Sequence, residues 1–244
     1  MYLIFPLLGI VLTVYYVQKF AKGRISKGTS VILYSIAKKE SNLPKEQMYN
    51  PIVTSGITVA LGGSAGLESP IVSSGSAIGS NYAQTYRIDY KDRTLLLACG
   101  AAAGIAAAFN APIAGVLFAL EVLLVDVSIS AFIPLMIAAA AGVLCANLLL
   151  EKEILLSFQL FEGFNYYNIL FYVLLGLFCG LISVYYSRIF LRIEHAFRRN
   201  KMVFSKAISG GIMLALLILM FPTLFGEGYQ SLKSLNDDQS RNLL

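Results

Sequence analysis

The sequence predicts an all-α protein that crosses a membrane several times and contains broken and re-entrant helices. Of its 244 residues, 57% are hydrophobic and only 14% are charged, and the mean hydropathy is +0.70. This composition lies far outside the balance of a soluble globular domain. Several apolar stretches are also shorter than the roughly 20 residues that a membrane-crossing helix needs. We therefore expect one transmembrane domain over residues 1–244, in a multi-pass integral protein of the cell (inner) membrane.

The expected helices follow the apolar stretches. The first, at about 2–18, lacks a basic n-region and a small-residue cleavage site, so it reads as a helix of the mature protein and not as a signal peptide. Three others are short and separated by Gly, Ser, Asn and Pro, which favours half-membrane helices that meet end to end. These short stretches lie at about 49–63, 70–86 and 112–125, and the longer ones at about 94–109, 129–150, 168–190 and 204–222.

The charged loops predict the orientation. Nearly all Lys and Arg residues lie in the segments 19–28, 37–46, 86–93 and 188–201, whereas residues 151–153 and Glu162 lie on a long loop with an acidic balance. The positive-inside rule places the basic loops in the cytoplasm. The net charge of +5 is then explained by cytoplasmic flanks beside anionic lipid, and we expect no nucleic-acid partner.

One carboxylate interrupts the small-residue run GSAGLESPIVSSGSAIG, residues 63–79. Ser69 is expected to cap a helix that begins at Pro70, which leaves unpaired N–H groups and the positive end of the helix dipole beside Glu68. Such a helix end attracts anions. An intramembrane carboxylate indicates a functional site, although Glu68 could instead simply cap the helix. The neighbouring small residues that allow a ligand to approach the backbone are Gly62, Gly63, Ala65 and Gly66.

A second informative stretch is CGAAAGIAAAFNAPIAGVLFALEVLL, residues 99–124. Small residues recur at helical spacing, which allows close packing of helix backbones. The interruption Phe109-Asn110-Ala111-Pro112 predicts that one helix ends and another begins, with Pro112 in the first turn of the second. Two broken helices in sequence are typical of transporter architecture. The small residues are Gly100, Ala101, Gly104, Ala108, Ala114 and Gly115.

Residues 100–121, GAAAGIAAAFNAPIAGVLFALE, resemble the signature of the CLC family of chloride channels and chloride/proton antiporters. GLESP, at 66–70, is similar to that family's Gly-Lys/Arg-Glu-Gly-Pro selectivity motif. The likeness extends to about residue 230. It implies an inverted-repeat membrane fold, a first repeat at about 1–150 and the start of a second at about 168–244. It also implies a homodimer with two pores and chloride at converging helix N-termini. We expect neither enzymatic activity nor a cofactor, because the sequence contains no nucleophile–base pair, metal cluster or phosphate loop.

The resemblance assigns roles to residues of both motifs. Glu68 matches the gating glutamate, whose carboxylate competes with chloride for the outer site. The backbone amides that match the lining of this site belong to Gly66, Leu67, Glu68 and Ser69. Leu67 stands where a basic residue is common and Ser69 where glycine is common, so we expect weaker anion binding. A possible inner anion site, represented only by SKGTS without the usual proline, consists of Ser26, Lys27 and Gly28.

One position distinguishes a channel from an antiporter. Proton-coupled members have a second glutamate directly after the one that matches Glu121, whereas this chain has Val122. We therefore expect no proton relay and favour a passive, voltage-gated-like anion channel. Glu121 is expected to make a structural hydrogen bond, and Asp126 to cap the following helix. The alternatives are a chloride/proton antiporter, a fluoride exporter of the same superfamily and a non-conducting fragment.

The remaining features indicate no further chemistry. The resemblance implies a longer second half, so we expect this chain to be an incomplete part of the fold. No metal site is expected, because His195 has no Cys, His or carboxylate at ligand spacing. The small-residue stretch 138–142 is compatible with a dimer interface or with packing inside the chain. We interpret the three cysteines as small buried hydrophobic residues, and these are Cys99, Cys145 and Cys179.

Overall fold

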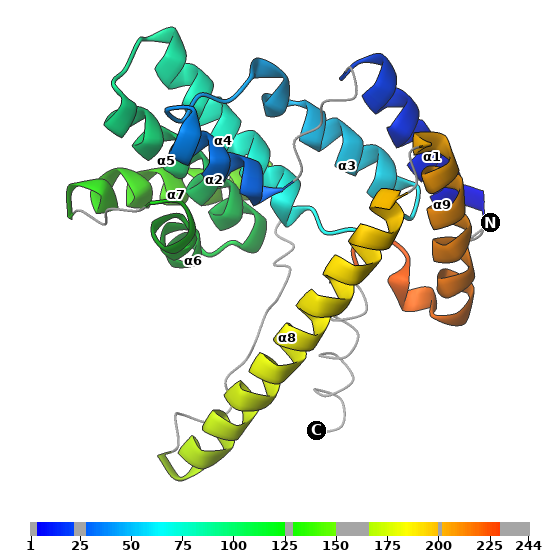
Figure 1. Cartoon of the computed structure of the whole chain (residues 1–244). Helices are drawn as coiled ribbons and strands as arrows, with labels where there is room; N and C mark the ends of the chain where they lie inside the picture. Colours follow the sequence, from blue (N-terminus) through cyan, green and yellow to red (C-terminus); the bar gives the residue numbers. More distant parts are fainter. Residues whose placement is uncertain (1–3, 22–27, 125–128, 150–165, 200–201, 230–244) are drawn as a thin grey trace.

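The computed structural model describes residues 4–21, 28–124, 129–149, 166–199 and 202–229, and every regular element in these ranges is a helix (Figure 1). In chain order the elements are α1 (Ile4–Lys19), α2 (Thr29–Lys38), the 3-10 turn η1 (Lys45–Met48), α3 (Asn50–Ala60), α4 (Glu68–Thr85), α5 (Tyr90–Phe109), α6 (Pro112–Phe118), the π-helical turn η2 (Ala119–Leu123), α7 (Ile129–Leu149), the 3-10 turn η3 (Tyr166–Asn168), α8 (Ile169–Arg199), α9 (Val203–Met220) and the 3-10 turn η4 (Pro222–Leu224). The all-α prediction is confirmed.

The helices have mixed lengths, as the apolar stretches predicted. Helix α3 has 11 residues and α6 only 7, too few to cross a bilayer. By length and hydropathy, four helices in the described part of the chain can cross a membrane, and they lie at 90–109, 130–149, 169–197 and 203–220. The chain therefore combines short helices with helices long enough to span a membrane, and the short helix α6 lies between two of the latter.

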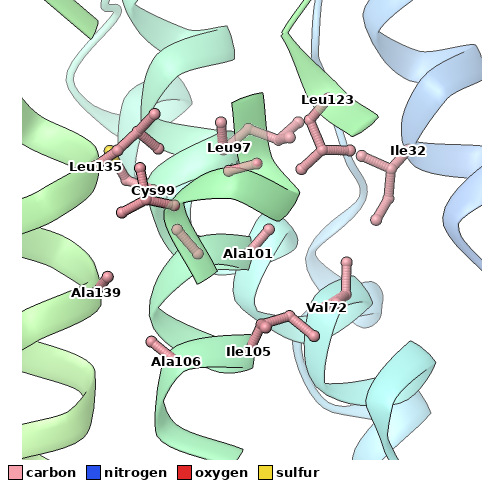
Figure 2. Packing of buried hydrophobic residues seen from close by; sticks show 14 of the residues in the cluster. Ile32, Val72, Leu97, Cys99, Ala101, Ile105, Ala106, Leu123, Leu135 and Ala139 are labelled. Atoms are coloured by element: carbon pink, nitrogen blue, oxygen red, sulfur yellow. The ribbon is translucent and has the colours of Figure 1, made fainter. Parts of the chain in front are cut away.

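Helix α5 is the centre of the packed core, with α4, α6 and α7 against it. Its backbone is approached closely by small residues from each neighbour. A Cβ added at Gly142 of α7 would stand 2.6 Å from the Ala103 carbonyl oxygen, so this side of the stretch 138–142 packs inside the chain, whereas Ala141 is exposed. Figure 2 shows Leu97 and Ile105 of α5 among side chains from the surrounding helices, all buried. The predicted packing through small residues is confirmed.

The break between α5 and α6 has the geometry that its residues predict. Asn110 adopts the left-handed conformation, with φ of 52°, and ends α5, while Ala111 precedes α6 and Pro112 is its first residue. Asparagine tolerates this conformation, and proline needs no N–H partner at that position. The Asn147 amide of α7 donates to Asn110 Oδ1 over 3.2 Å, which attaches α7 to the break.

Polar contacts hold the segment between α2 and α3 against α4. The Gln47 amide donates to Ser73 Oγ over 2.8 Å, and the Leu43 N–H donates to Ser80 Oγ over 3.0 Å. Both serines are buried. Polar groups inside a membrane protein need internal partners, and these bonds supply them for Ser73 and Ser80 of α4, the helix that begins at Glu68. The buried hydroxyls of Ser74 and Ser76 have no hydrogen-bond partner among the described residues.

The later helices are arranged differently from the core. Helix α9 packs against α1, whereas α8 extends away from the rest of the chain, and its described side chains are almost all exposed (Figure 1). The division into two inverted repeats stays a prediction.

Candidate functional site

Glu68 is the first residue of α4 and follows the loop that leaves α3. The Ile71 N–H donates to the Leu67 carbonyl over 3.0 Å, and this is the first bond of the helix. The amides that precede Ile71 therefore have no acceptor inside the helix. The expectation that Ser69 caps a helix starting at Pro70 is wrong. Leu67 already has near-helical angles, φ −92° and ψ −8°, so the helix starts at Glu68 and no side chain caps it.

The Glu68 carboxylate lies on one side of this helix end. Tyr229 Oη donates a hydrogen bond to Glu68 Oε1. Glu68 Oε2 lies over Gly66, in the space that a Cβ of residue 66 would occupy. Among the described residues, no backbone amide of 66–69 donates to this carboxylate. The Glu68 side chain is thus held by a tyrosine that is far away in the sequence. The amides at the start of α4 remain available to another hydrogen-bond acceptor.

Tyr229 reaches Glu68 because the segment after α9, residues 225–229, lies on the loop between α3 and α4. The Phe225 ring covers Gly62, where any side chain would collide with it. The Gly226 N–H donates to the Gly62 carbonyl over 3.4 Å. The sequence did not predict the contact between Tyr229 and Glu68, which are 161 positions apart in the chain. The two glycines of the segment GEGY, residues 226–229, predict a turn. They do not indicate which residue Tyr229 contacts.

The environment of Tyr229 keeps its hydroxyl protonated. Burial, the hydrogen bond to Glu68 and the negative charges of Glu68 and Glu227 raise the pKa of Tyr229 to about 12. All of these effects favour the neutral phenol over the phenolate. Tyr229 is consequently a hydrogen-bond donor at any pH near neutrality.

Comparison with known proteins identifies the family. Residues 8–243 match the family described as voltage gated chloride channel. The chain belongs to the CLC family. It is 28% identical over 208 residues to a putative chloride channel protein, ClcB-like, of Ralstonia nicotianae, covering 83% of this chain and 48% of that protein. It is 30% identical over 182 residues to the voltage-gated ClC-type chloride channel ClcB of Escherichia coli, covering 73% and 43% respectively.

Solved CLC structures have the same fold. A slow cyanobacterial Cl⁻/H⁺ antiporter superimposes with a TM-score of 0.76 at 22% identity, over 93% of this chain and 55% of that one. A CLC-type fluoride/proton antiporter superimposes with a TM-score of 0.77 at 26% identity, over 88% and 54%. The chain is thus an integral membrane protein of a family of anion channels and transporters, and it spans about half the length of these relatives.

The predicted inner anion site of this CLC protein is described at one residue. Ser26 and Lys27 lie outside the described residues, whereas Gly28 has a φ of 67° and precedes α2. A Cβ at Gly28 would stand 3.6 Å from Ser69 Oγ. The fold therefore brings the glycine of the first motif beside the start of α4, from a distance of about 40 residues along the chain. Its role in anion binding stays a prediction.

The two positions that bear on proton coupling lie in the π-helical turn η2. Val122 packs against the hydrophobic core. Glu121 is exposed and has no hydrogen-bond partner in the described part of the chain, so the expectation of a structural hydrogen bond is wrong. The π turn directs this side chain away from the core that Val122 joins. Asp126 lies outside the described residues.

The other candidate residues add no site. His195 is exposed, and its Nδ1 lies 2.8 Å from the Leu191 carbonyl oxygen of its own helix. The described residues contain no group of His, Cys, Asp and Glu side chains suited to a metal. Cys99 is buried as predicted, but Cys145 and Cys179 are exposed on α7 and α8. Apolar sequence alone does not separate buried helix faces from exposed ones in a membrane protein.

Proposed function

We propose that the complete protein is a CLC-type anion channel in which Glu68 gates an outer anion site at the start of α4. The supporting observation is that the Glu68 carboxylate accepts a hydrogen bond from Tyr229, while no side chain among the described residues accepts a hydrogen bond from the backbone amides of residues 66–69. A helix N-terminus with free amides binds anions. The carboxylate is a tethered anion, which occupies this site when seated and yields it to chloride when it moves away.

Competition of this kind suits conduction. An ion must bind well enough to enter a pore and weakly enough to leave it. The site is lined by backbone amides of Gly66, Leu67, Glu68 and Ser69, without a basic side chain among them. We infer weak chloride binding, and we also propose a homodimer in the complete protein, as the family resemblance implies.

A channel is proposed in preference to an antiporter because Val122 carries no titratable group. The two solved relatives named above are described as antiporters for chloride or fluoride with protons. Transport of protons by this chain is therefore the competing function. A fluoride exporter is the other alternative. Comparing fluoride efflux with chloride efflux in the same liposomes distinguishes it from a chloride transporter.

The test of the gate is Glu68→Gln and Glu68→Ala in the complete protein reconstituted into liposomes. We expect both variants to raise chloride efflux and to flatten its dependence on pH, because no carboxylate then competes for the amides. The matched control is Glu46→Gln, an exposed glutamate before α3, which should leave efflux unchanged. Loss of efflux in Glu68→Gln with normal folding would support the capping role instead.

A further inference from the structure

The contact between Tyr229 and Glu68 joins two parts of the chain that fold around different helices. Glu68 belongs to α4, which packs on α5, whereas Tyr229 follows α9, which packs on α1. Phe225 and Gly226 attach the tyrosine segment to Gly62, in the same loop that leads to Glu68. Two adjacent residues therefore attach the Tyr229 segment to one point, Gly62, in the loop that leads to Glu68.

The turn that presents Tyr229 requires glycine twice. Gly226 and Gly228 have φ values of 80° and 79°, a conformation that other residues rarely adopt. Glu227, between them, is exposed and adds a second negative charge near Tyr229. Because the charge of Glu227 is negative, it repels the Glu68 carboxylate and cannot be what holds it near Tyr229. The attraction comes from the phenolic hydroxyl, which donates its hydrogen bond to Glu68 Oε1.

Space for the carboxylate on this side of the helix comes from Gly66. Glu68 Oε2 occupies the volume that any side chain at residue 66 would need. The carboxylate is therefore held in this position by a hydrogen bond from Tyr229, and the missing side chain of Gly66 leaves room for it. The carboxylate held there makes no bond to the amides of residues 66–69 in the described structure.

We propose that Tyr229 is a latch for the gate: a positioning residue that holds the Glu68 carboxylate away from the amides at the start of α4. The proposal rests on the proposed role of Glu68. It assigns the latched carboxylate to the conducting state, in which the amides are free for an anion. The seated carboxylate belongs to the non-conducting state, and Tyr229 shifts the population between the two.

The central experiment is a double-mutant cycle on chloride efflux by the complete protein, with Tyr229→Phe, Glu68→Ala and the double variant. A hydrogen bond to a charged group shifts such an equilibrium by about tenfold or more. We expect Tyr229→Phe to lower efflux by about tenfold or more, and to lose this effect completely when residue 68 is alanine. The control is Tyr86→Phe, which removes an exposed hydroxyl and should change nothing.

A second variant tests the direction of the effect without altering the size of the ring. Incorporation of 3-fluorotyrosine at position 229 makes the phenol a stronger donor, so we expect efflux above that of the native protein. This variant also covers the case in which phenylalanine impairs folding, which size-exclusion chromatography reports.

The outcomes separate the latch from the gate. If Glu68→Ala leaves efflux unchanged, the proposed gate fails. If Glu68→Ala raises efflux while Tyr229→Phe has no effect, has the opposite effect, or lowers efflux equally in the alanine background, the latch is overturned and the gate stands. Unchanged or lower efflux with 3-fluorotyrosine also overturns the latch.

Discussion

Gly75 of α4 and Gly100 of α5 face each other, and each lies so close that a Cβ on one would collide with the carbonyl oxygen of the other. One turn further along α4, Gly79 lies in the same way against the Leu96 carbonyl. The two backbones are therefore in contact over a full turn. This contact sets the direction of α4, and with it the place where its first residue, Glu68, stands.

Replacing Gly100 with alanine should destabilise the α4–α5 pair by about 2–3 kcal/mol, because the added methyl group meets backbone that cannot rotate away. The measurement is the temperature at which the detergent-solubilised complete protein loses its monodisperse size-exclusion peak. Gly56→Ala is the matched control, since a Cβ there meets nothing within 4 Å. It should be neutral or slightly stabilising. Equal stability of the two variants would contradict the packing argument.

Chloride transport by the complete protein should not move protons in a fixed ratio. Val122 is partly buried against the hydrophobic core and has no titratable group. The check is simultaneous recording of chloride and pH in a suspension of liposomes under a chloride gradient. Glu121→Gln should leave the result unchanged, because that exposed side chain has no partner in the described residues. Stoichiometric proton uptake driven by chloride alone would establish an antiporter.

The basic loops 19–28, 86–93 and 188–201 should face the cytoplasm. In a background without Cys145 and Cys179, both exposed, a single cysteine at Lys91 should resist an impermeant thiol reagent added to intact cells. A cysteine at position 152 should react. Permeabilised cells supply the control, because both positions should then be labelled. The reverse pattern would reject the orientation that the positive-inside rule predicts.

Local chemistry explains which predictions were accurate. The break at Asn110 and Pro112 was predicted because each residue has a strong conformational preference of its own. The start of α4 was misplaced because Ser69 and Pro70 are both common at helix starts, yet Leu67 already has near-helical angles. The environments of Glu121 and Cys179 were not predictable, since exposure depends on which helices pack together.

The sequence alone determined the class of the protein. Composition required a membrane, small residues at helical spacing required close helix contacts, and the motifs around Glu68 and Asn110 identified the CLC family. Only the tertiary structure decided where the Glu68 carboxylate lies. Its partner, Tyr229, is 161 residues away and belongs to a segment whose sequence indicates a turn and nothing more. Residues that far apart meet through helix packing, which no local preference encodes, and so the position of the Glu68 carboxylate is a property of the fold.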